Sequence, residues 1–137
     1  MRTLYNVLPT GRRHYRITLA DALDAHREAL TYSGRIGLAR QDGLESAIAR
    51  PYSGYHRPIA NKCAALLHGV IKNHPFADGN KRTAWILAAQ LIDRSGYELV
   101  LTPSERIDDF VVAVADSQLS FEEIVEWFKL RIKRPQS

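Results

Sequence analysis

Two apolar segments joined by a short polar loop constrain the fold of this chain most strongly. The first, from Ile59 to Lys72, is apolar on nearly every side of a helix, and the second, from Asn80 to Ser95, carries a broad apolar stripe. A helix without a polar face is normally buried among other helices. We therefore expect these two helices at the centre of the molecule, with Gly96 capping the second.

The N-terminal half also has a helical pattern. Thr18 and Asp21 form a capping box, and Gly43 opens a short helix that Arg50-Pro51 stops. The positions at helical spacing after the box are Leu19, Leu23, His26 and Leu30. The segment from Tyr52 to Pro58 is rich in turn formers and predicts an exposed loop.

The C-terminal third contains two helix starts. Residues 102–105 combine an N-cap, a proline at the first helical position and a capping-box glutamate, and Ser120 with Glu123 begins the last helix. Tyr97 to Leu101 is β-prone without a clear partner, so an extended loop is expected there. The prediction is one all-α domain over residues 1–137, a compact bundle of about six helices with a core from about 17 to 130 and flexible ends. Disorder is expected only in the last few residues, from Lys133 on.

Composition indicates a soluble globular protein. The chain has 137 residues, 45% of them hydrophobic and 25% charged, which suits one ordinary domain. No apolar run approaches the length of a membrane span, and the N-terminus lacks a signal-peptide core. A single cysteine, Cys63, excludes an internal disulfide and fits a reducing cytoplasm, so we expect a cytoplasmic protein without a membrane partner.

The net charge of +4 is compatible with nucleic acid, an acidic protein or a phosphorylated ligand as the partner. Basic residues cluster only at Arg12-Arg13 and between Arg131 and Arg134, and no aromatic residues alternate with them as in single-strand binders. Nucleic acid is therefore the least favoured of the three.

The loop from His74 to Thr83 has the features of a phosphate-binding catalytic site. Its turn leads into a helix whose first amides have no partners within that helix, and a glycine lets an anion approach the backbone. Lys81 and Arg82 in the first helical turn oppose the helix dipole, which a bound polyanion would explain.

Each residue of the loop has a candidate role and a simpler alternative. His74 is placed to take a proton from a hydroxyl, or it merely ends a helix. Asp78 is a hard oxygen ligand suited to Mg²⁺ that is shared with phosphates. Asn80 either caps the helix or donates to a phosphate oxygen. In the simpler alternative, Asp78 and Asn80 belong to an ordinary turn. Phe76 is expected to point inward and hold the loop to the core. In the simpler alternative for the two cations, Lys81 and the arginine after it are only solvated surface charges. The alternatives together require several independent coincidences.

The loop resembles the signature of the Fic/Doc family, His-x-Phe-x-(Asp/Glu/Asn)-(Gly/Ala)-Asn-x-Arg between two central helices. The matching residues are His74, Phe76, Asp78, Gly79, Asn80 and Arg82. Residues 40–51 and 64–69 also resemble the death-on-curing (Doc) branch, and the likeness runs from about Ile17 to Phe128. It implies the all-α fold of that family.

Two positions distinguish the branches of the family. AMP-transferring members typically have glycine after the asparagine and a second arginine three residues after the first, where this chain has Lys81 and Trp85. The Asn-Lys-Arg form is similar to Doc toxins, which phosphorylate a threonine of the translation factor EF-Tu with ATP and thereby block translation.

The resemblance also implies roles for the loop residues. His74 would be the base and Asp78 the Mg²⁺ ligand, while Lys81 and Arg82 would offset charge in the transfer. The residues implied in phosphate binding are Asp78, Gly79, Asn80, Lys81 and Arg82.

Partners follow from the same resemblance. The family aligns its target on a flap, and the corresponding loop here would be Tyr52, Ser53, Gly54, Tyr55 and His56, unless it is a solvated connection. The inhibitory Ser/Thr-x-x-x-Glu-(Gly/Asn) pattern of many Fic proteins does not occur in the chain. Restraint is therefore expected from an antitoxin with a disordered acidic segment, which the +4 charge suits.

Three other functions remain open from the sequence. A Fic-type enzyme would transfer AMP or another nucleoside monophosphate to a protein hydroxyl. A module without turnover would bind nucleotide or a partner only. A nucleic-acid-binding protein would show affinity that falls steeply with salt.

Overall fold

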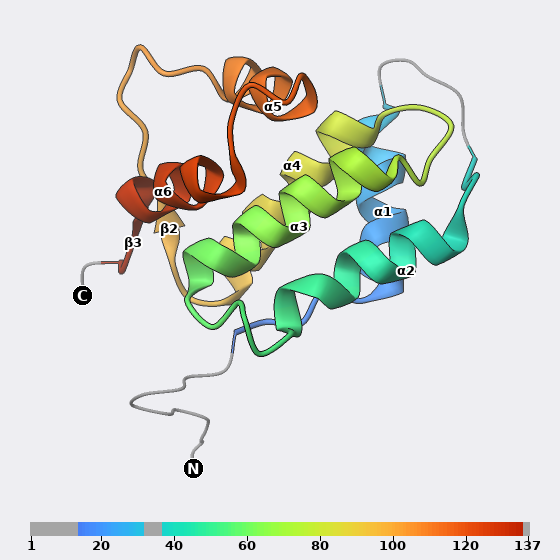
Figure 1. The fold of residues 1–137 in the computed structure, drawn as a ribbon, viewed down its shortest axis with the longest axis horizontal. Coiled ribbons are helices and arrows are strands. Elements are labelled where there is room, and N and C mark those ends of the chain that lie inside the picture. Colours follow the sequence, from blue (N-terminus) through green and yellow to red (C-terminus); the bar gives the residue numbers. More distant parts are fainter. Residues whose placement is uncertain (1–13, 32–36, 136–137) are drawn as a thin grey trace.

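The computed structural model of this chain describes residues 14–31 and 37–135 (Figure 1). Within those ranges the protein consists of six α-helices, one 3-10 turn and one pair of very short strands. In chain order they are α1 (Leu19–Ala29), α2 (Gln41–Ala49), η1 (Arg50–Tyr52), α3 (Ile59–Asn73), α4 (Asn80–Arg94), β2 (Glu98–Leu99), α5 (Ile107–Ala115), α6 (Phe121–Arg131) and β3 (Ile132–Lys133). The predicted all-α class is confirmed.

The two helices predicted at the centre form a hairpin of α3 and α4 (Figure 1). Helices α2 and α6 pack against α3, and α1 packs against α4, so α3 is surrounded on most sides. The α2–α3 contact is close because Gly69 has no side chain: a Cβ there would lie 3.3 Å from the Cβ of Ala47. One continuous buried cluster contains residues of every α-helix in the described ranges. No helix in these ranges is long and apolar enough to cross a bilayer.

Two of the predicted helix starts are confirmed in atomic detail. At α1, the Asp21 N–H donates to Thr18 Oγ1 at 3.0 Å and the Thr18 N–H donates to Asp21 Oδ2 at 3.0 Å. At α6, Ser120 and Glu123 exchange the same pair of bonds at 2.8 and 3.1 Å. A capping box involves residues only three positions apart, so the sequence alone specified both helix starts.

The predicted helix start at residues 102–105 is wrong. These residues form a turn, in which the Glu105 N–H donates to the Thr102 carbonyl at 3.1 Å and the Thr102 N–H donates to the Glu105 carboxylate at 2.6 Å. Helix α5 begins only at Ile107. The Glu105 carboxylate also forms an ion pair with Arg131 of α6, so its side chain is engaged with a distant helix.

The stretch from Tyr97 to Leu101 has a partner after all. Strand β2 pairs antiparallel with β3, with Glu98 opposite Lys133 and Leu99 opposite Ile132. The prediction of an unpaired loop is therefore wrong, as is the prediction that disorder begins at Lys133. The pairing joins segments more than thirty residues apart, which local sequence patterns do not report. Residues 1–13 and 136–137, where flexible ends were predicted, lie outside the described ranges.

Candidate active site

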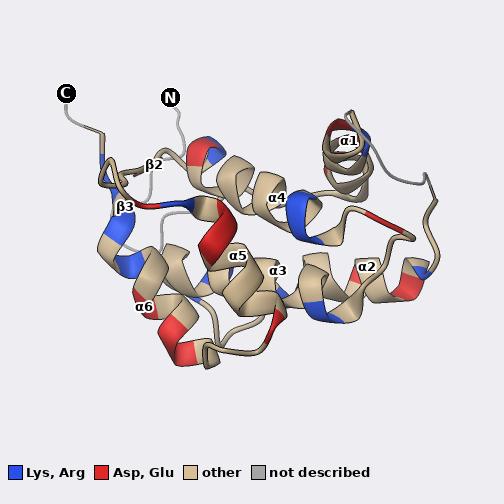
Figure 2. Cartoon of the chain, turned by 90° about the horizontal axis from the view of Figure 1, so that it is seen from above, with Lys and Arg blue, Asp and Glu red and all other residues tan. Residues whose placement is uncertain are grey.

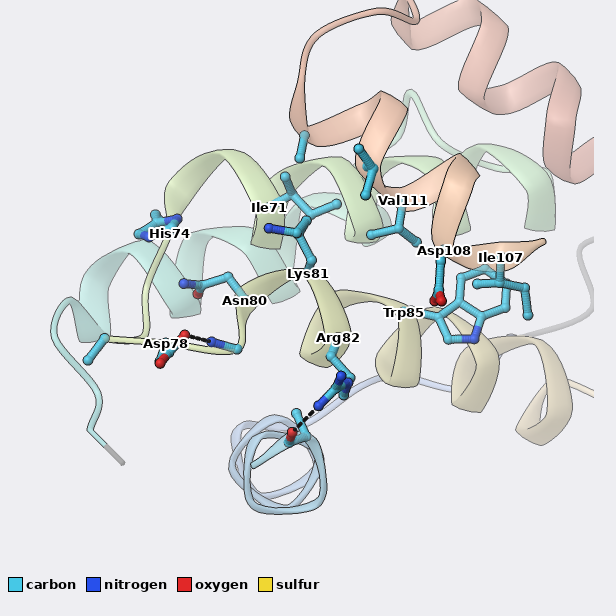
Figure 3. Close-up of a pocket in the computed structure, with 15 residues that line it drawn as sticks. Ile71, His74, Asp78, Asn80, Lys81, Arg82, Trp85, Ile107, Asp108 and Val111 are labelled. Atoms are coloured by element: carbon cyan, nitrogen blue, oxygen red, sulfur yellow. Dashed lines mark hydrogen bonds between the residues drawn. The ribbon is translucent and has the colours of Figure 1, made fainter. Parts of the chain in front are cut away.

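The loop between α3 and α4 opens onto a pocket of about 750 Å³. The loop itself and the first turn of α4 form one side, the end of α3 contributes Ile71 and His74, and α5 forms the opposite wall (Figure 3). The loop that was predicted to be catalytic therefore lines a pocket. Sites of this kind are where small ligands usually bind.

His74 is turned out of the helix that precedes it. It is the C-cap of α3 and adopts a left-handed backbone (φ 50, ψ 54) while its N–H donates to the Val70 carbonyl at 3.2 Å. A residue other than glycine seldom adopts this conformation, and such residues cluster at functional sites. The side chain is exposed at the edge of the pocket (Figure 3).

Phe76 and a histidine of α1 hold the loop from below. Phe76 is 1% exposed, as predicted, and its ring stacks on His26 with centroids 3.8 Å apart and planes 7° from parallel. His26 is also buried, and its Nε2 lies 3.0 Å from the Asp78 backbone oxygen. Because a carbonyl only accepts, that ring nitrogen is the donor.

Sequence reasoning missed the role of His26 and treated it as one more position of an apolar stripe. The available signal was its type, because a polar ring on the buried face of a helix needs a hydrogen-bond partner. Which partner it finds depends on the folded chain.

Asn80 closes the loop on itself. The side chain is 5% exposed, its Oδ1 accepts from the Phe76 N–H at 3.0 Å and its Nδ2 donates to the Phe76 carbonyl at 3.0 Å. Both polar atoms of the amide are therefore engaged within the loop. A phosphate at the end of α4 would meet backbone N–H groups before it met this side chain.

Gly79 is required by the backbone at the start of α4. It is the N-cap, with φ 76 and ψ 19, and no side chain caps the helix there. A Cβ at this position would lie 3.2 Å from Leu30 Cδ2 of the adjacent segment. The sequence therefore places glycine where L side chains are strained and where the backbone of the helix end must stay accessible.

The two cations of the first turn of α4 point to different places (Figure 3). Lys81 extends into the pocket beside Ile71 and Val111. Arg82 extends towards α1, where its Nη1 donates to the Ala29 carbonyl at 3.0 Å. The arginine also lines the pocket, so it is close to the site but attached to the C-terminal end of α1, which a cation stabilises. Its contact with phosphate stays a prediction.

The surroundings of Asp78 bear on its predicted role as a Mg²⁺ ligand. It is exposed at the pocket, and one carboxylate oxygen accepts from the Gly79 N–H at 2.9 Å. No group of three or more His, Cys, Asp or Glu side chains in the described ranges could enclose a metal. A single carboxylate fits Mg²⁺ that is bound mainly through nucleotide phosphates, which is the usual arrangement for this ion. Binding of Mg²⁺ itself stays a prediction.

The structure does not bring the predicted flap, Tyr52 to His56, to this site. The flap precedes α3 whereas His74 follows it, and the 15 residues of α3 span about 22 Å. The Tyr52 hydroxyl instead accepts from the Ile17 N–H at 2.7 Å and donates to the Tyr15 carbonyl at 2.8 Å, and burial raises its pKa. Tyr52 thus anchors the segment before α1.

A different segment lies against the loop. Ala39 and Arg40 both donate backbone N–H groups to the Pro75 carbonyl, at 2.8 and 2.9 Å, and Ala77 donates to the Gly37 carbonyl at 3.0 Å. The segment just before α2 therefore borders the site, contrary to the placement of the flap in the sequence analysis. The length of α3 separates the Tyr52 segment from the active-site loop, and the turn-forming composition of that segment does not reveal this.

Comparison with known proteins identifies the family. Residues 16–92 match the model of the Fic/DOC family, a span that includes α1 to α3, the loop and most of α4. The chain belongs to this family, as its resemblance indicated, and is a group-transfer enzyme of the Fic/Doc kind. It is also similar to a curated protein named Toxin Doc from Mycolicibacterium smegmatis, with 29% identity over 102 residues that cover 70% of this chain and 78% of that protein. Helices α5 and α6 lie outside the family match.

Proposed function

We propose that this protein is a Doc-type toxin that transfers the γ-phosphate of ATP to a hydroxyl of a target protein. The observation that carries the proposal is Lys81, which occupies the pocket at the helix end beside the loop that His74 begins. The similarity to a protein named Toxin Doc supports the toxin part. The expected target is a threonine of EF-Tu, so that translation in the cytoplasm would stop.

Residues of the loop and of α4 supply the groups that the proposed phosphoryl transfer needs. The imidazole of His74 takes the proton of the target hydroxyl, whose oxygen then bonds to the γ-phosphorus while the bond to the β–γ bridging oxygen breaks and ADP leaves. Lys81 and the backbone N–H groups at the start of α4 stabilise the negative charge that develops on the phosphate oxygens. Bound Mg²⁺ would neutralise β- and γ-phosphate charge, and Asp78 would hold it.

Arg82 enters this scheme as a second cation. Its guanidinium would leave the Ala29 carbonyl, or share it, to reach a phosphate oxygen. Asn80 would act by position, because its side chain fixes the loop between His74 and Gly79.

An antitoxin is the expected regulator. A toxic enzyme needs restraint, and a partner with a disordered acidic segment would match the +4 charge of this chain. Co-expression with such a partner should restore growth to cells in which the protein alone stops it.

Labelled ATP tests the chemistry directly. The purified protein is incubated with EF-Tu and with ATP labelled at either the α- or the γ-phosphate, and EF-Tu is analysed by intact mass. We expect γ-label and a mass gain of one phosphate. Incorporation of α-label would show nucleotidyl transfer instead. His74→Ala should abolish either label and relieve growth arrest; an equally toxic variant would point to a binding module without turnover.

The Lys81 side chain has its own test, because AMP-transferring relatives typically have glycine at this position. We expect Lys81→Gly to lower γ-phosphate transfer by at least a hundredfold, since a charge in contact with the transferred group is lost. The ratio of α- to γ-label on EF-Tu is measured in parallel. An unchanged rate of γ-transfer would remove Lys81 from the mechanism.

A further inference from the structure

The pocket has two chemically different ends. One end is formed by the loop, Lys81 and the start of α4, where the groups are N–H donors and cations. The other end is formed by Trp85, Ile107 and Val111, which are apolar (Figure 3). The first end suits phosphates. The second end is not used by the phosphoryl transfer proposed above and needs its own explanation.

Trp85 is held in place at the apolar end. It follows Lys81 by four residues, so it lies on the same side of α4, about 6 Å further along the axis. Its ring is half-buried and is supported from behind, parallel to Phe128 at 6.3 Å and edge-on to Trp127 at 6.1 Å. Phe128 is fully buried, so this support is part of the core. The indole is thus a fixed surface at the wall of the pocket.

Charge gives the pocket a direction. Asp108 lines the apolar end with a side chain that is 85% exposed and lies 3.7 Å from the guanidinium of Arg106, and the first turn of α5 also contains Asp109. Figure 2 shows this acidic turn in red and the basic first turn of α4 in blue. Carboxylates repel a phosphate, so a triphosphate would bind with its charged chain at Lys81 and its uncharged nucleoside near Trp85.

We propose that Trp85 is the platform on which the base of the nucleotide co-substrate stacks, with Ile107 and Val111 closing the apolar slot. This inference rests on the proposed function, because it assumes a nucleotide whose phosphates occupy the loop. A base has a flat aromatic face, and stacking on a fixed aromatic side chain is a common way of binding it. Trp85 therefore sets affinity for the nucleoside part and leaves affinity for the phosphates unchanged.

Two ligands separate the two ends of the pocket. Binding of ATP and of inorganic tripolyphosphate, both with Mg²⁺, is measured by calorimetry on the full chain. We expect Trp85→Leu to weaken ATP binding about tenfold and tripolyphosphate binding less than twofold. Trp85→Phe should retain ATP binding within about threefold, since a smaller aromatic face remains.

Fluorescence supplies a second readout, in which Trp85 itself is retained. The chain has two tryptophans, and Trp127 stacks on Phe110 at 3.7 Å, outside the residues that line the pocket. In Trp127→Phe only Trp85 fluoresces, and ATP should quench it strongly while tripolyphosphate should not. In Trp85→Phe the remaining Trp127 signal should hardly respond to either ligand.

The outcomes distinguish this inference from the proposed function. Equal losses of affinity for ATP and tripolyphosphate in Trp85→Leu would show that Trp85 only supports the fold. Unchanged ATP affinity in that variant, or no quenching of Trp85 by ATP, would also overturn the platform. In each of these cases the phosphate site stands. A wild-type protein that binds neither ligand would overturn the nucleotide site and the platform together.

Discussion

At the scale of single residues, the loop depends on side chains that bond to the chain itself. Asn80 ties the loop to itself through two bonds to Phe76, and His26 supports it by stacking and by donating to the Asp78 carbonyl. Gly79 then allows the sharp entry into α4. These contacts restrain the loop from which His74 and Lys81 reach the pocket, and such preorganisation is what electrostatic catalysis requires.

Replacing the glycine of this turn tests the strain argument. Gly79→Ala places a Cβ on a backbone with φ 76 and 3.2 Å from Leu30 Cδ2, so we expect a loss of about 1–3 kcal/mol in the free energy of unfolding. Transferase activity should fall as well, because the start of α4 shifts. Urea denaturation measures the stability.

Gly54→Ala is the matched control for this change. A Cβ at Gly54 meets no atom within 4 Å, and its stability should stay within about 0.5 kcal/mol of the wild type. Equal losses in the two variants would contradict the assigned conformation of Gly79.

At the scale of elements, α5 decides the shape of the pocket. It is anchored at one end by Phe110, whose ring stacks on Trp127 at 3.7 Å, and at the other by Lys72 of α3, which donates to the Ala115 carbonyl at 3.2 Å. The helix lies outside the span that matches the family. The wall that would close the slot opposite Trp85 is therefore contributed by the part of the chain that the family model does not cover.

Two segments whose sequences resemble helix caps should differ in how much they stabilise the protein. Ser120→Ala removes an acceptor that binds the Glu123 N–H, and should cost about 1 kcal/mol of stability. Thr102→Ala alters a residue that sequence patterns also mark as an N-cap but that lies in a turn, so it should cost less than about 0.5 kcal/mol. Thermal or urea unfolding of both variants provides the comparison. A larger loss for Thr102→Ala would mean that α5 starts earlier than Ile107.

At the scale of the whole molecule, α3 organises the fold and brings together groups from distant elements. On its side facing α6, Phe121 lies against the rings of His56 and His68, and Arg50 lies over the same phenyl ring. Burial lowers the pKa of both histidines, and the positive charge of Arg50 lowers the pKa of each further. The folded state therefore favours neutral imidazoles at this junction.

A dependence of stability on pH follows from these two groups. Because their pKa values are lower in the folded than in the unfolded chain, the unfolded chain binds more protons near the ordinary histidine value of 6.5. Stability should be complete above that value and should decrease as the pH falls through it towards the lowered values. Urea midpoints between about pH 5 and 7.5 measure this.

The variant with His56→Gln and His68→Gln should show a weaker slope in the same range. An unchanged slope would assign the effect to other groups. Asp21 adds a separate dependence at lower pH: burial raises the pKa of its carboxyl, but bonds from Tyr15, Thr18 and Arg94 outweigh burial and lower it. Its contribution is present above the ordinary value of 3.8 and is lost only below it.

The sequence by itself determined the local features of this protein. Helical periodicity, the capping boxes at Thr18 and Ser120 and the burial of Phe76 were all predicted, because each depends on residues within a few positions of one another. The loop from His74 to Arg82 was also identified from the sequence as the candidate site. Its charge and its position before a helix are properties of adjacent residues, and its family is confirmed.

Only the tertiary structure decided what surrounds that loop. Groups from distant parts of the chain determine the pairing of β2 with β3, the support from His26, the direction of Arg82 and the place of the segment after Tyr52. Local patterns carry no record of such contacts, because many pairings of distant segments are compatible with the same helices. The packed core selects one of them, and with it the wall of the pocket opposite Lys81.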